Sequence, residues 1–356
     1  MALRVLVAPD KFKGTLPSPE VCAAIAAGWR RVRPDDELVT MPMADGGDGT
    51  AAALLGAFPG AEWVTTWSVD AVGRPFRGRY LRAGKTAVIE LAEVCGLTAL
   101  ESPDPMGSHT IGLGIVVTAA MRSGARRLLV ALGGSASTDG GAGLLSALGA
   151  HLIGRGGILP AGGGGLSNLA RVDLDHLIPL PDQGVEVLVD VDAPLLGPRG
   201  AAAVFGPQKG ASAEQIAELE AGLSRLAAVL GGSPDAPGAG AAGGTGYGMA
   251  CWGATLVSGA ARVGGLIGLD GAVDRADIVI TGEGRYDETS TSGKASGYVL
   301  SLAGSRPTVV IAGAVAEKLR GDGVFSLTEI AGSTESARKD PSRWITVAAE
   351  QAARRV

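Results

Sequence analysis

Short apolar runs alternate along the chain with helical stretches, and most of the runs end in acidic residues or glycines. Short apolar runs that stand next to helices of about 10–15 residues are typical of parallel α/β sheets. The pattern therefore predicts an α/β fold with a mostly parallel sheet. The runs are Leu3–Ala8, Leu38–Ala44, Thr86–Leu91, Arg127–Leu132, Val185–Val191, Asp277–Thr281 and Thr308–Ile311.

One region departs from this alternation. The runs Glu62–Val69, Arg77–Arg82 and Thr86–Leu91 follow one another too closely for intervening helices. Their spacing predicts antiparallel strands, and so a mixed sheet or a second domain. Further along, Ser212–Gln215 has the sequence of a capping box and predicts a helix that continues to about Leu230.

Length and composition narrow the class of protein. The chain has 356 residues, which favours two domains or one large α/β domain with an insertion. Hydrophobic residues make up 46% and charged residues 19%, which argues against an intrinsically disordered chain. A net charge of −5 without a basic run makes a general nucleic-acid binder improbable.

The same sequence favours the cytoplasm. Its longest uncharged stretch, 236–261, contains eight glycines and a proline, which predicts a loop leading into a helix and not a membrane span. The chain starts directly with an apolar strand pattern, without the features of a signal peptide. Cys22, Cys95 and Cys251 are far apart in the sequence, so a disulfide framework or a zinc site is improbable.

Charged residues and glycines gather where the predicted strands end. Ligands of open α/β sheets bind at the carboxyl ends of the parallel strands. Acids suit Mg²⁺, while cations and backbone N–H groups suit phosphates, so this edge is typical of a Mg²⁺-phosphate site. The charged residues in question are Asp10, Lys11, Lys13, Asp45, Asp48, Asp139, Asp190, Lys209, Glu283, Arg285, Asp287 and Lys294.

Several glycine-rich segments have both a functional and a structural interpretation. Residues 133–143 form either an anion-binding nest or a tightly packed strand–helix turn, with the helix beginning near Gly141. Residues 44–50 hold two acids among three glycines, where helix capping explains the acids but not the glycines. Residues 237–246 contain G-x-G-x-x-G after a loop, so a dinucleotide fingerprint is excluded, and a flexible linker and a phosphate-covering loop both stay open.

Two acidic pairs complete the candidate chemistry. Asp190 and Asp192 interrupt an apolar run and, in an extended strand, lie on one face. Glu283, Arg285 and Asp287 alternate after a strong strand, which indicates either a ligand site or a surface salt-bridge cluster. Lys294 is followed by Ala295, so no phosphate-binding P-loop is present.

These segments together resemble the bacterial glycerate kinases, which phosphorylate D-glycerate with ATP. Any one segment is weakly specific, but they occur in the family's order from about residue 3 to 315. Three residues depart from the family pattern: Asp48 stands in place of Glu, Leu113 in place of Thr, and Ile115 in place of an acid or amide. The matching segments are APDKFK (8–13), ADGGDGT (44–50), GGSASTDGGAG (133–143), FGPQKGAS (205–212), PGAGAAGG (237–244), TGEGRYD (281–287) and Gly293-Lys294.

The resemblance implies two α/β domains with a cleft between them. One is expected to be flavodoxin-like and discontinuous, formed by residues 1–65 and 270–356, and the other to be inserted at residues 66–269 with a mixed sheet. ATP and Mg²⁺ are the expected cofactors and D-glycerate the expected substrate, with 2- or 3-phosphoglycerate and ADP as products. Partners such as nucleic acid or membranes are not expected, and the oligomeric state stays open.

Site roles follow from this hypothesis. Catalysis is expected from Lys13, Asp45, Asp190 and Arg285, with Asp45 or Asp190 accepting the hydroxyl proton. ATP is expected to bind Gly133, Gly134, Ser135, Asp139, Lys209, Gly238, Gly240, Gly243 and Lys294, and Mg²⁺ to bind Asp190, Glu283 and Asp287. Two alternatives stay open: a kinase of another small hydroxy acid such as tartronate or a tetronate, and a sensor that binds nucleotide or carboxylate without catalysis.

Overall fold

The computed structural model describes residues 2–291 and 294–356, and in it the chain forms two compact α/β units. The first unit consists of Met1–Asp45, Ala52–Ala57 and Gly259–Val356, and the second of Gly46–Ala51 and Phe58–Ser258. Each unit has its own sheet and its own hydrophobic core. The predicted domain boundaries, residues 1–65 with 270–356 and residues 66–269, stay a prediction.

The first unit is built on a five-stranded parallel sheet in the order β14-β13-β12-β1-β2. Counted along this unit alone, the order is 2-1-3-4-5, the order of flavodoxin-like sheets. The predicted flavodoxin-like, mostly parallel sheet is thereby confirmed. The strands are β1 (Arg4–Val7), β2 (Glu37–Thr40), β12 (Ile278–Tyr286), β13 (Thr308–Val315) and β14 (Val324–Ser326).

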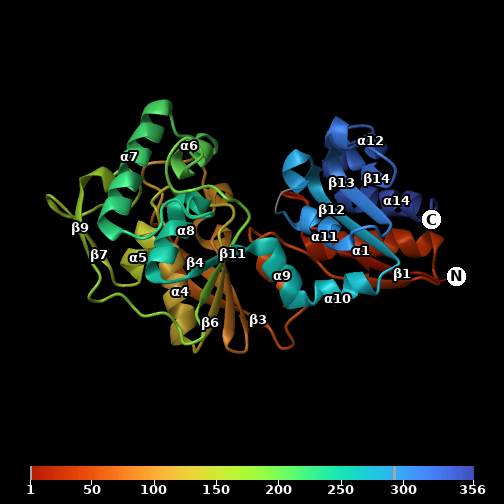
Figure 1. Cartoon of the computed structure of the whole chain (residues 1–356), viewed down its shortest axis with the longest axis horizontal. Helices are drawn as coiled ribbons and strands as arrows, with labels where there is room; N and C mark the ends of the chain where they lie inside the picture. The colour runs from red at the N-terminus through yellow and green to blue at the C-terminus, as the bar shows by residue number, and fades with distance from the viewer. Residues whose placement is uncertain (1, 292–293) are drawn as a thin grey trace. The chain divides into compact units, whose positions relative to one another are not determined.

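Helices cover this sheet on both faces. Helix α1 (Ser18–Val32) packs directly against α14 (Pro341–Ala353), and both contribute to a core with β1, β12 and β13 (Figure 1). Helix α11 (Ala295–Ala303) contributes Leu300 to a smaller cluster around Val310 on β13. The remaining helices of the unit are α9 (Gly259–Ile267), α10 (Leu269–Asp274), α12 (Leu327–Ala331) and α13 (Thr334–Lys339), with 3-10 turns η4 (Glu288–Thr291) and η5 (Glu317–Leu319).

The second unit holds a six-stranded mixed sheet in the order β11-β10-β6-β5-β4-β3. Strands β5, β6, β10 and β11 are parallel, whereas β3 pairs with β4 and β4 with β5 in antiparallel fashion. The predicted antiparallel strands and mixed sheet are thus confirmed. The strands are β3 (Glu62–Val69), β4 (Pro75–Ala83), β5 (Thr86–Glu90), β6 (Arg127–Ala131), β10 (Val185–Val189) and β11 (Thr255–Ser258).

Helices of the second unit pack on this sheet, and two sequence signals for them are confirmed. The capping box of Ser212 and Gln215 forms both of its hydrogen bonds and opens α7 (Ala213–Leu230). Helix α5 (Ala142–Ala147) begins directly after Gly141. The other helices and turns are α3 (Ala92–Cys95), α4 (Ile111–Arg122), α6 (Ala201–Phe205), α8 (Ala241–Trp252), η1 (Leu97–Ala99), η2 (Leu166–Asn168) and η3 (Pro207–Lys209). Helix α2 (Thr50–Leu55) begins in the second unit and continues in the first, because the division falls between Ala51 and Ala52.

The sequence missed two features of this unit. A small antiparallel sheet of β7 (His151–Gly154), β8 (Gly157–Ile158) and β9 (Leu169–Asp173) has no alternating pattern of apolar and polar residues, because its strands are short and two of them contain glycine. The stretch 236–261 contains helix α8 and strand β11 and is not simply a loop leading into a helix. Its residues Ala239–Ala241 and Gly243–Met249 are buried, which contradicts the flexible-linker interpretation.

Two further observations concern apolar helices and cysteines. No helix in residues 2–291 and 294–356 is long and apolar enough to span a membrane. Cys22, Cys95 and Cys251 are all free thiols.

We predict that Gly28→Ala destabilises the first unit by about 1–3 kcal/mol through overpacking. A Cβ at Gly28 collides with the Thr346 carbonyl oxygen and lies 2.9 Å from the Ala349 Cβ, so α1 and α14 have to separate. Gly265→Ala, also in a helix, is the matched control. Nothing lies within 4 Å of its Cβ, so the better helix propensity of alanine raises stability slightly. Thermal and urea unfolding measure both, and equal effects at the two positions contradict the prediction.

Candidate functional site

The order of strands in the first unit creates a natural ligand site. Strands β1 and β12 are neighbours, and the chain leaves them toward opposite edges of the sheet, to β2 and to β13. Ligands of open α/β sheets bind at the carboxyl ends of strands at such a switch point. Asp10 follows β1 and its N–H donates to the Gly282 carbonyl (2.8 Å), while Glu283 lies in β12 itself. Two acids therefore meet at the predicted place.

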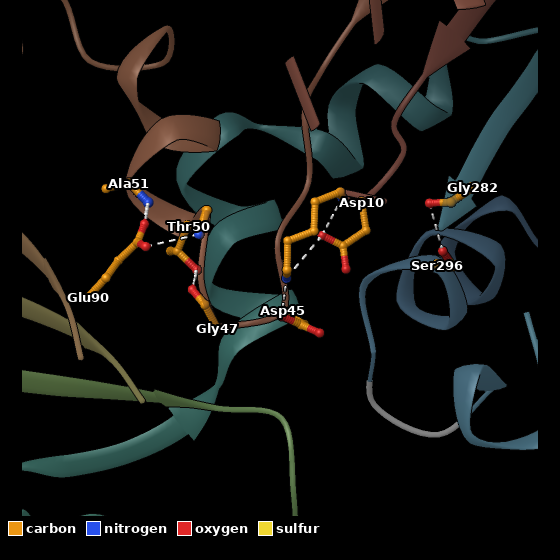
Figure 2. Close-up of polar contacts among 10 residues, drawn as sticks. Asp10, Asp45, Gly47, Thr50, Ala51, Glu90, Gly282 and Ser296 are labelled. Carbon is orange, nitrogen blue, oxygen red and sulfur yellow. Dashed lines mark hydrogen bonds and ion pairs between the residues drawn. The ribbon is translucent and has the colours of Figure 1, made fainter. Parts of the chain in front are cut away.

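A lysine joins two acids beside this point. Lys11 Nζ lies 3.4 Å from Asp45 Oδ1 and 3.7 Å from Asp10 Oδ1 (Figure 2). The three side chains are only 10–12% exposed, so water screens their charges weakly. Asp45 follows β2, the strand next to β1, which explains how residues far apart in sequence come together.

The acids of this cluster outnumber its cation. Burial and the nearby charge of Asp45 raise the pKa of Asp10 to about 8, with a smaller contribution from Glu283, while Lys11 opposes the shift. Burial raises the pKa of Glu283 as well, and hydrogen bonds with Ser296 and Ser290 oppose this. Among the described residues nothing hydrogen-bonds to Glu283 Oε1. We refer to Asp10, Lys11, Asp45 and Glu283 as the switch-point cluster.

Other predicted residues of the first unit lie at the surface. Lys13 is exposed, and its neighbour Lys11 makes the contacts with the acids. Arg285 has a 74% exposed side chain and pairs with Asp287 (3.0 Å). Hydrogen bonds from Thr289 and Arg285 occupy both oxygens of Asp287 and hold its pKa below the usual range.

Lys294, a predicted ATP contact, hydrogen-bonds to the turn that contains Asp287 and Thr289. Lys294 Nζ donates to Thr289 Oγ1 (2.9 Å), whose hydroxyl donates to Asp287 Oδ1 (2.6 Å). Gly293, which forms the family-like pair with Lys294, lies outside the described residues.

The predicted metal ligands divide between the units. Glu283 and Asp287 belong to the first unit, whereas Asp190 belongs to the second. In the part of the chain that the structure describes, no three His, Cys, Asp or Glu side chains are arranged to hold a metal ion. Mg²⁺ is commonly bound through one or two carboxylates plus substrate phosphates and water, and the switch-point cluster fits that kind of binding because its acids exceed its cation.

Glu90, which the sequence analysis did not single out, organises the loop Gly46–Ala51 in the second unit. It ends β5 and is 4% exposed. Its carboxylate accepts hydrogen bonds from the N–H groups of Gly49 (2.9 Å) and Ala51 (2.6 Å), as Figure 2 shows. Only its position at the end of a buried strand, where the other candidate acids lie, could have signalled this role.

Close backbone approach explains one glycine of this loop, Gly46, and the first glycine of the next one, Gly133. A Cβ at Gly46 would lie 2.9 Å from the Leu188 carbonyl carbon, and a Cβ at Gly133 would lie 2.5 Å from the Gly47 Cα. Gly46 and Gly49 also have φ values of 93° and 84°, which favour glycine. The loop therefore packs backbone to backbone on the ends of β6 and β10.

The segment Gly133–Gly143 leads from β6 into α5 with most of its polar groups buried. Gly134 has a φ of 80°, and the Ser135 and Ser137 hydroxyls lie 3.0 Å apart. Asp139 is fully buried and accepts hydrogen bonds from main-chain and side-chain donors at both oxygens. Its carboxylate is thus occupied by the protein.

The remaining predicted ATP contacts are also packed inside the second unit. A Cβ at Gly238 would lie 3.0 Å from Val189 Cγ2, and a Cβ at Gly240 would lie 3.0 Å from the Ala193 carbonyl oxygen. A Cβ at Gly243 would collide with the Ser137 carbonyl oxygen. Lys209 is 2% exposed and its Nζ donates to the Ser137 carbonyl oxygen.

One interpretation of the sequence needs correction, and one departure from the family pattern has a structural explanation. Strand β10 ends at Val189, so Asp190 and Asp192 follow the strand and do not share one of its faces. Leu113 is fully buried within the hydrophobic core of the second unit and Ile115 is half-buried on the same helix, α4. The apolar residue at position 113 therefore extends core packing.

Comparisons with known proteins point to one family. A model described as the glycerate kinase family matches residues 5–356. The chain is 39% identical over 355 residues to a protein named glycerate 2-kinase from Escherichia coli (strain K12), covering 94% of this chain and 93% of that protein. It is 38% identical over 363 residues to a glycerate kinase from Bacillus subtilis (strain 168), covering 96% and 95%.

A solved structure agrees with the sequence matches. It is a crystal structure named for glycerate kinase 2 from Salmonella typhimurium LT2, with a TM-score of 0.83 and 34% identity. The match covers 100% of this chain and 98% of that chain.

We predict that Asp10→Asn changes how stability depends on pH. Because the folded pKa of Asp10 lies above its unfolded value, the protonated acid stabilises the fold at low pH, and this stability is lost as pH rises through about 8. The neutral, isosteric asparagine has no such loss. The free energy of unfolding of the variant, relative to that of wild type, therefore rises by at least about 1.4 kcal/mol from pH 5 to pH 9, which is the equivalent of one pKa unit.

Thermal unfolding across this pH range, in EDTA to remove divalent cations, measures the effect. Asp192→Asn, at an exposed position, is the control and leaves the pH profile unchanged. Parallel profiles for wild type and Asp10→Asn contradict the assigned origin of the shift.

Proposed function

Because the chain belongs to the glycerate kinase family, we propose that it transfers the γ-phosphoryl group of ATP to the 2-hydroxyl of D-glycerate, giving 2-phosphoglycerate and ADP. The name of the Escherichia coli relative, glycerate 2-kinase, supports the 2-position. The observation that carries the proposal for this chain is the switch-point cluster. Phosphoryl transfer needs a carboxylate that accepts a proton and carboxylates that bind Mg²⁺, and this cluster holds more buried carboxylates than its lysine can pair with. A reaction between two soluble metabolites favours the cytoplasm.

Asp45 is the proposed base for the glycerate hydroxyl. Of the two acids beside Lys11, Asp10 has a pKa raised to about 8 and therefore retains its proton at neutral pH. Asp45 is the other acid, and Lys11 Nζ lies 3.4 Å from its Oδ1. A carboxylate held by a lysine is oriented to accept a proton from an attacking hydroxyl. Asp190 remains the alternative base and is tested alongside it.

The cations and Mg²⁺ have distinct proposed roles. Lys13 and Arg285, both exposed, are proposed to bind the glycerate carboxylate or the transferring phosphoryl group, and Lys294 a phosphate of ATP. Glu283 is the strongest of the proposed Mg²⁺ ligands, because its buried Oε1 lacks a partner among the described residues. Asp287 fits less well, since its own turn occupies both oxygens. When bound, Mg²⁺ would neutralise charge on the ATP phosphates.

Backbone groups are the proposed phosphate ligands in the second unit. The start of the loop, Gly133, Gly134 and Ser135, follows a strand end, where N–H groups can turn toward an anion. Gly238, Gly240 and Gly243 are proposed to form the second part of this phosphate-binding backbone.

We predict that the purified protein releases ADP with ATP, Mg²⁺ and D-glycerate, and that phosphorus NMR identifies the product as 2-phosphoglycerate. Tartronate and a tetronate are tested in the same assay and are expected to react more slowly. A 3-phosphoglycerate signal contradicts the regiochemistry alone. Faster turnover of another hydroxy acid contradicts the substrate, and nucleotide binding without ADP release favours a sensor.

We also predict that Asp45→Asn lowers kcat by about 100-fold or more, the contribution typical of a general base. Asp190→Asn is measured in parallel, with Asp192→Asn as the exposed control. If kcat falls strongly in Asp190→Asn and stays near normal in Asp45→Asn, the base is Asp190 and not Asp45. Circular dichroism establishes that each variant is folded before its rate is interpreted.

A further inference from the structure

The two glycine-rich loops of the second unit, 133–143 and 238–248, pack backbone against backbone. The Gly140 N–H donates to the Gly243 carbonyl oxygen (3.0 Å). A Cβ at Gly243 would lie 2.6 Å from the Thr138 Cα, and a Cβ at Gly248 would lie 2.5 Å from the Gly140 carbonyl oxygen. Neither loop can therefore move at this contact without disturbing the other.

A buried lysine lies at the contact between the loops. Lys209 ends the 3-10 turn η3, and only 2% of the residue is exposed. Its Nζ donates to the Ser137 carbonyl oxygen in the first loop and would lie 2.9 Å from a Cβ at Gly243 in the second. A lysine ammonium is rarely buried to this degree unless it is paired and hydrogen-bonded.

Asp139 holds the first loop through a separate set of hydrogen bonds. Its Oδ2 accepts hydrogen bonds from the Thr110 N–H (2.8 Å), the Thr110 hydroxyl (2.8 Å) and the Gly143 N–H (3.1 Å), and its Oδ1 accepts one from the Gly141 N–H (3.1 Å). These donors belong to the starts of α4 and α5, so the carboxylate ties two helix starts to the first loop.

The lysine and the carboxylate also interact electrostatically. Burial lowers the pKa of Lys209 to about 8, and the negative charge of Asp139 opposes this shift. The negative charge of Asp139 thus offsets part of the cost of burying the Lys209 ammonium. Four donors occupy the two oxygens of Asp139, and the Lys209 ammonium is directed at a main-chain carbonyl.

We propose that Lys209 and Asp139 are positioning residues that hold the two glycine-rich loops in their nucleotide-binding conformation and make no contact with ATP themselves. Lys209 acts through the Ser137 carbonyl, and Asp139 acts through the N–H groups of Thr110, Gly141 and Gly143. The part of this inference that concerns ATP rests on the proposed kinase function, whereas the part that concerns loop order does not.

Lysine acylation of the intact protein tests the accessibility of Lys209. An N-hydroxysuccinimide ester modifies exposed lysines, and mass spectrometry quantifies each site with and without Mg²⁺-ATP. We expect Lys209 to stay unmodified in both conditions, while the exposed Lys13 reacts in the absence of nucleotide. Rapid modification of Lys209 without nucleotide, and protection by ATP, overturns the proposal.

Lys209→Met tests the effect on the loops, with Lys13→Met as a control outside the second unit and Lys209→Arg as a variant that keeps the charge. Hydrogen exchange in residues 133–143 and 238–248 is expected to be about 10-fold faster in Lys209→Met, because a hydrogen bond from a charged donor is lost. Unchanged exchange in both segments overturns the proposal, and this readout needs no kinase activity.

Ligand affinity separates positioning from phosphate contact. If Lys209 positions the loops, Lys209→Met weakens ATP binding and speeds exchange in the two loops together, whereas a direct phosphate contact weakens ATP binding and leaves the exchange unchanged. The absence of ATP binding by wild type contradicts the proposed function, while the exchange experiment still decides the positioning role.

Asp139→Asn tests the positioning role of Asp139 independently of Lys209, and Asp192→Asn, at an exposed position, is its control. An asparagine presents an NH₂ group to donors that need an acceptor, so exchange is expected to be faster at Thr110, Gly141 and Gly143. Unchanged exchange at all three amides overturns the positioning role of Asp139.

Discussion

The parallel pairing of β1 with β12 is the constraint on which the first unit depends. It aligns Val5 with Ile278 and Val7 with Ile280, although most of the chain separates them in sequence. This pairing completes a sheet from two distant segments and creates the point where the strand connections diverge. Asp10, Asp45 and Glu283 can share one environment only because their strands are neighbours in that sheet.

The second unit depends on a different constraint, close contact between main chains. Its glycine-rich segments lie against one another and against strand ends, with no room for a side chain at Gly133 or Gly243. Such contacts bring polar backbone groups into the interior, where each requires a partner. Buried Glu90, Asp139 and Lys209 supply those partners. Burying these charges costs stability, and their hydrogen bonds offset that cost.

Periodicity and strand spacing predicted most strands of the two large sheets and the mixed sheet, because they report directly on burial. The flavodoxin-like unit was an implication of the resemblance to the glycerate kinases. The sequence could not show why a glycine is needed at a given position. A glycine that allows a phosphate to approach and one that allows another main chain to approach give the same pattern, and at Gly243 the neighbour is main chain. It also could not choose between Lys11 and Lys13, since only the turn after β1 decides which ammonium lies beside Asp45.

The acids at the strand ends illustrate what the structure adds to this pattern. All follow or end apolar runs, and on sequence alone Asp139, Glu283 and Asp287 are all ligand candidates, the first for ATP and the other two for Mg²⁺. Asp139 and Asp287 have both oxygens occupied by donors from their own surroundings, whereas Glu283 retains a buried oxygen without a partner among the described residues. An unsatisfied buried oxygen is costly to leave without a ligand. The number of donors around each carboxylate therefore distinguishes acids that build the fold from acids that are available for chemistry.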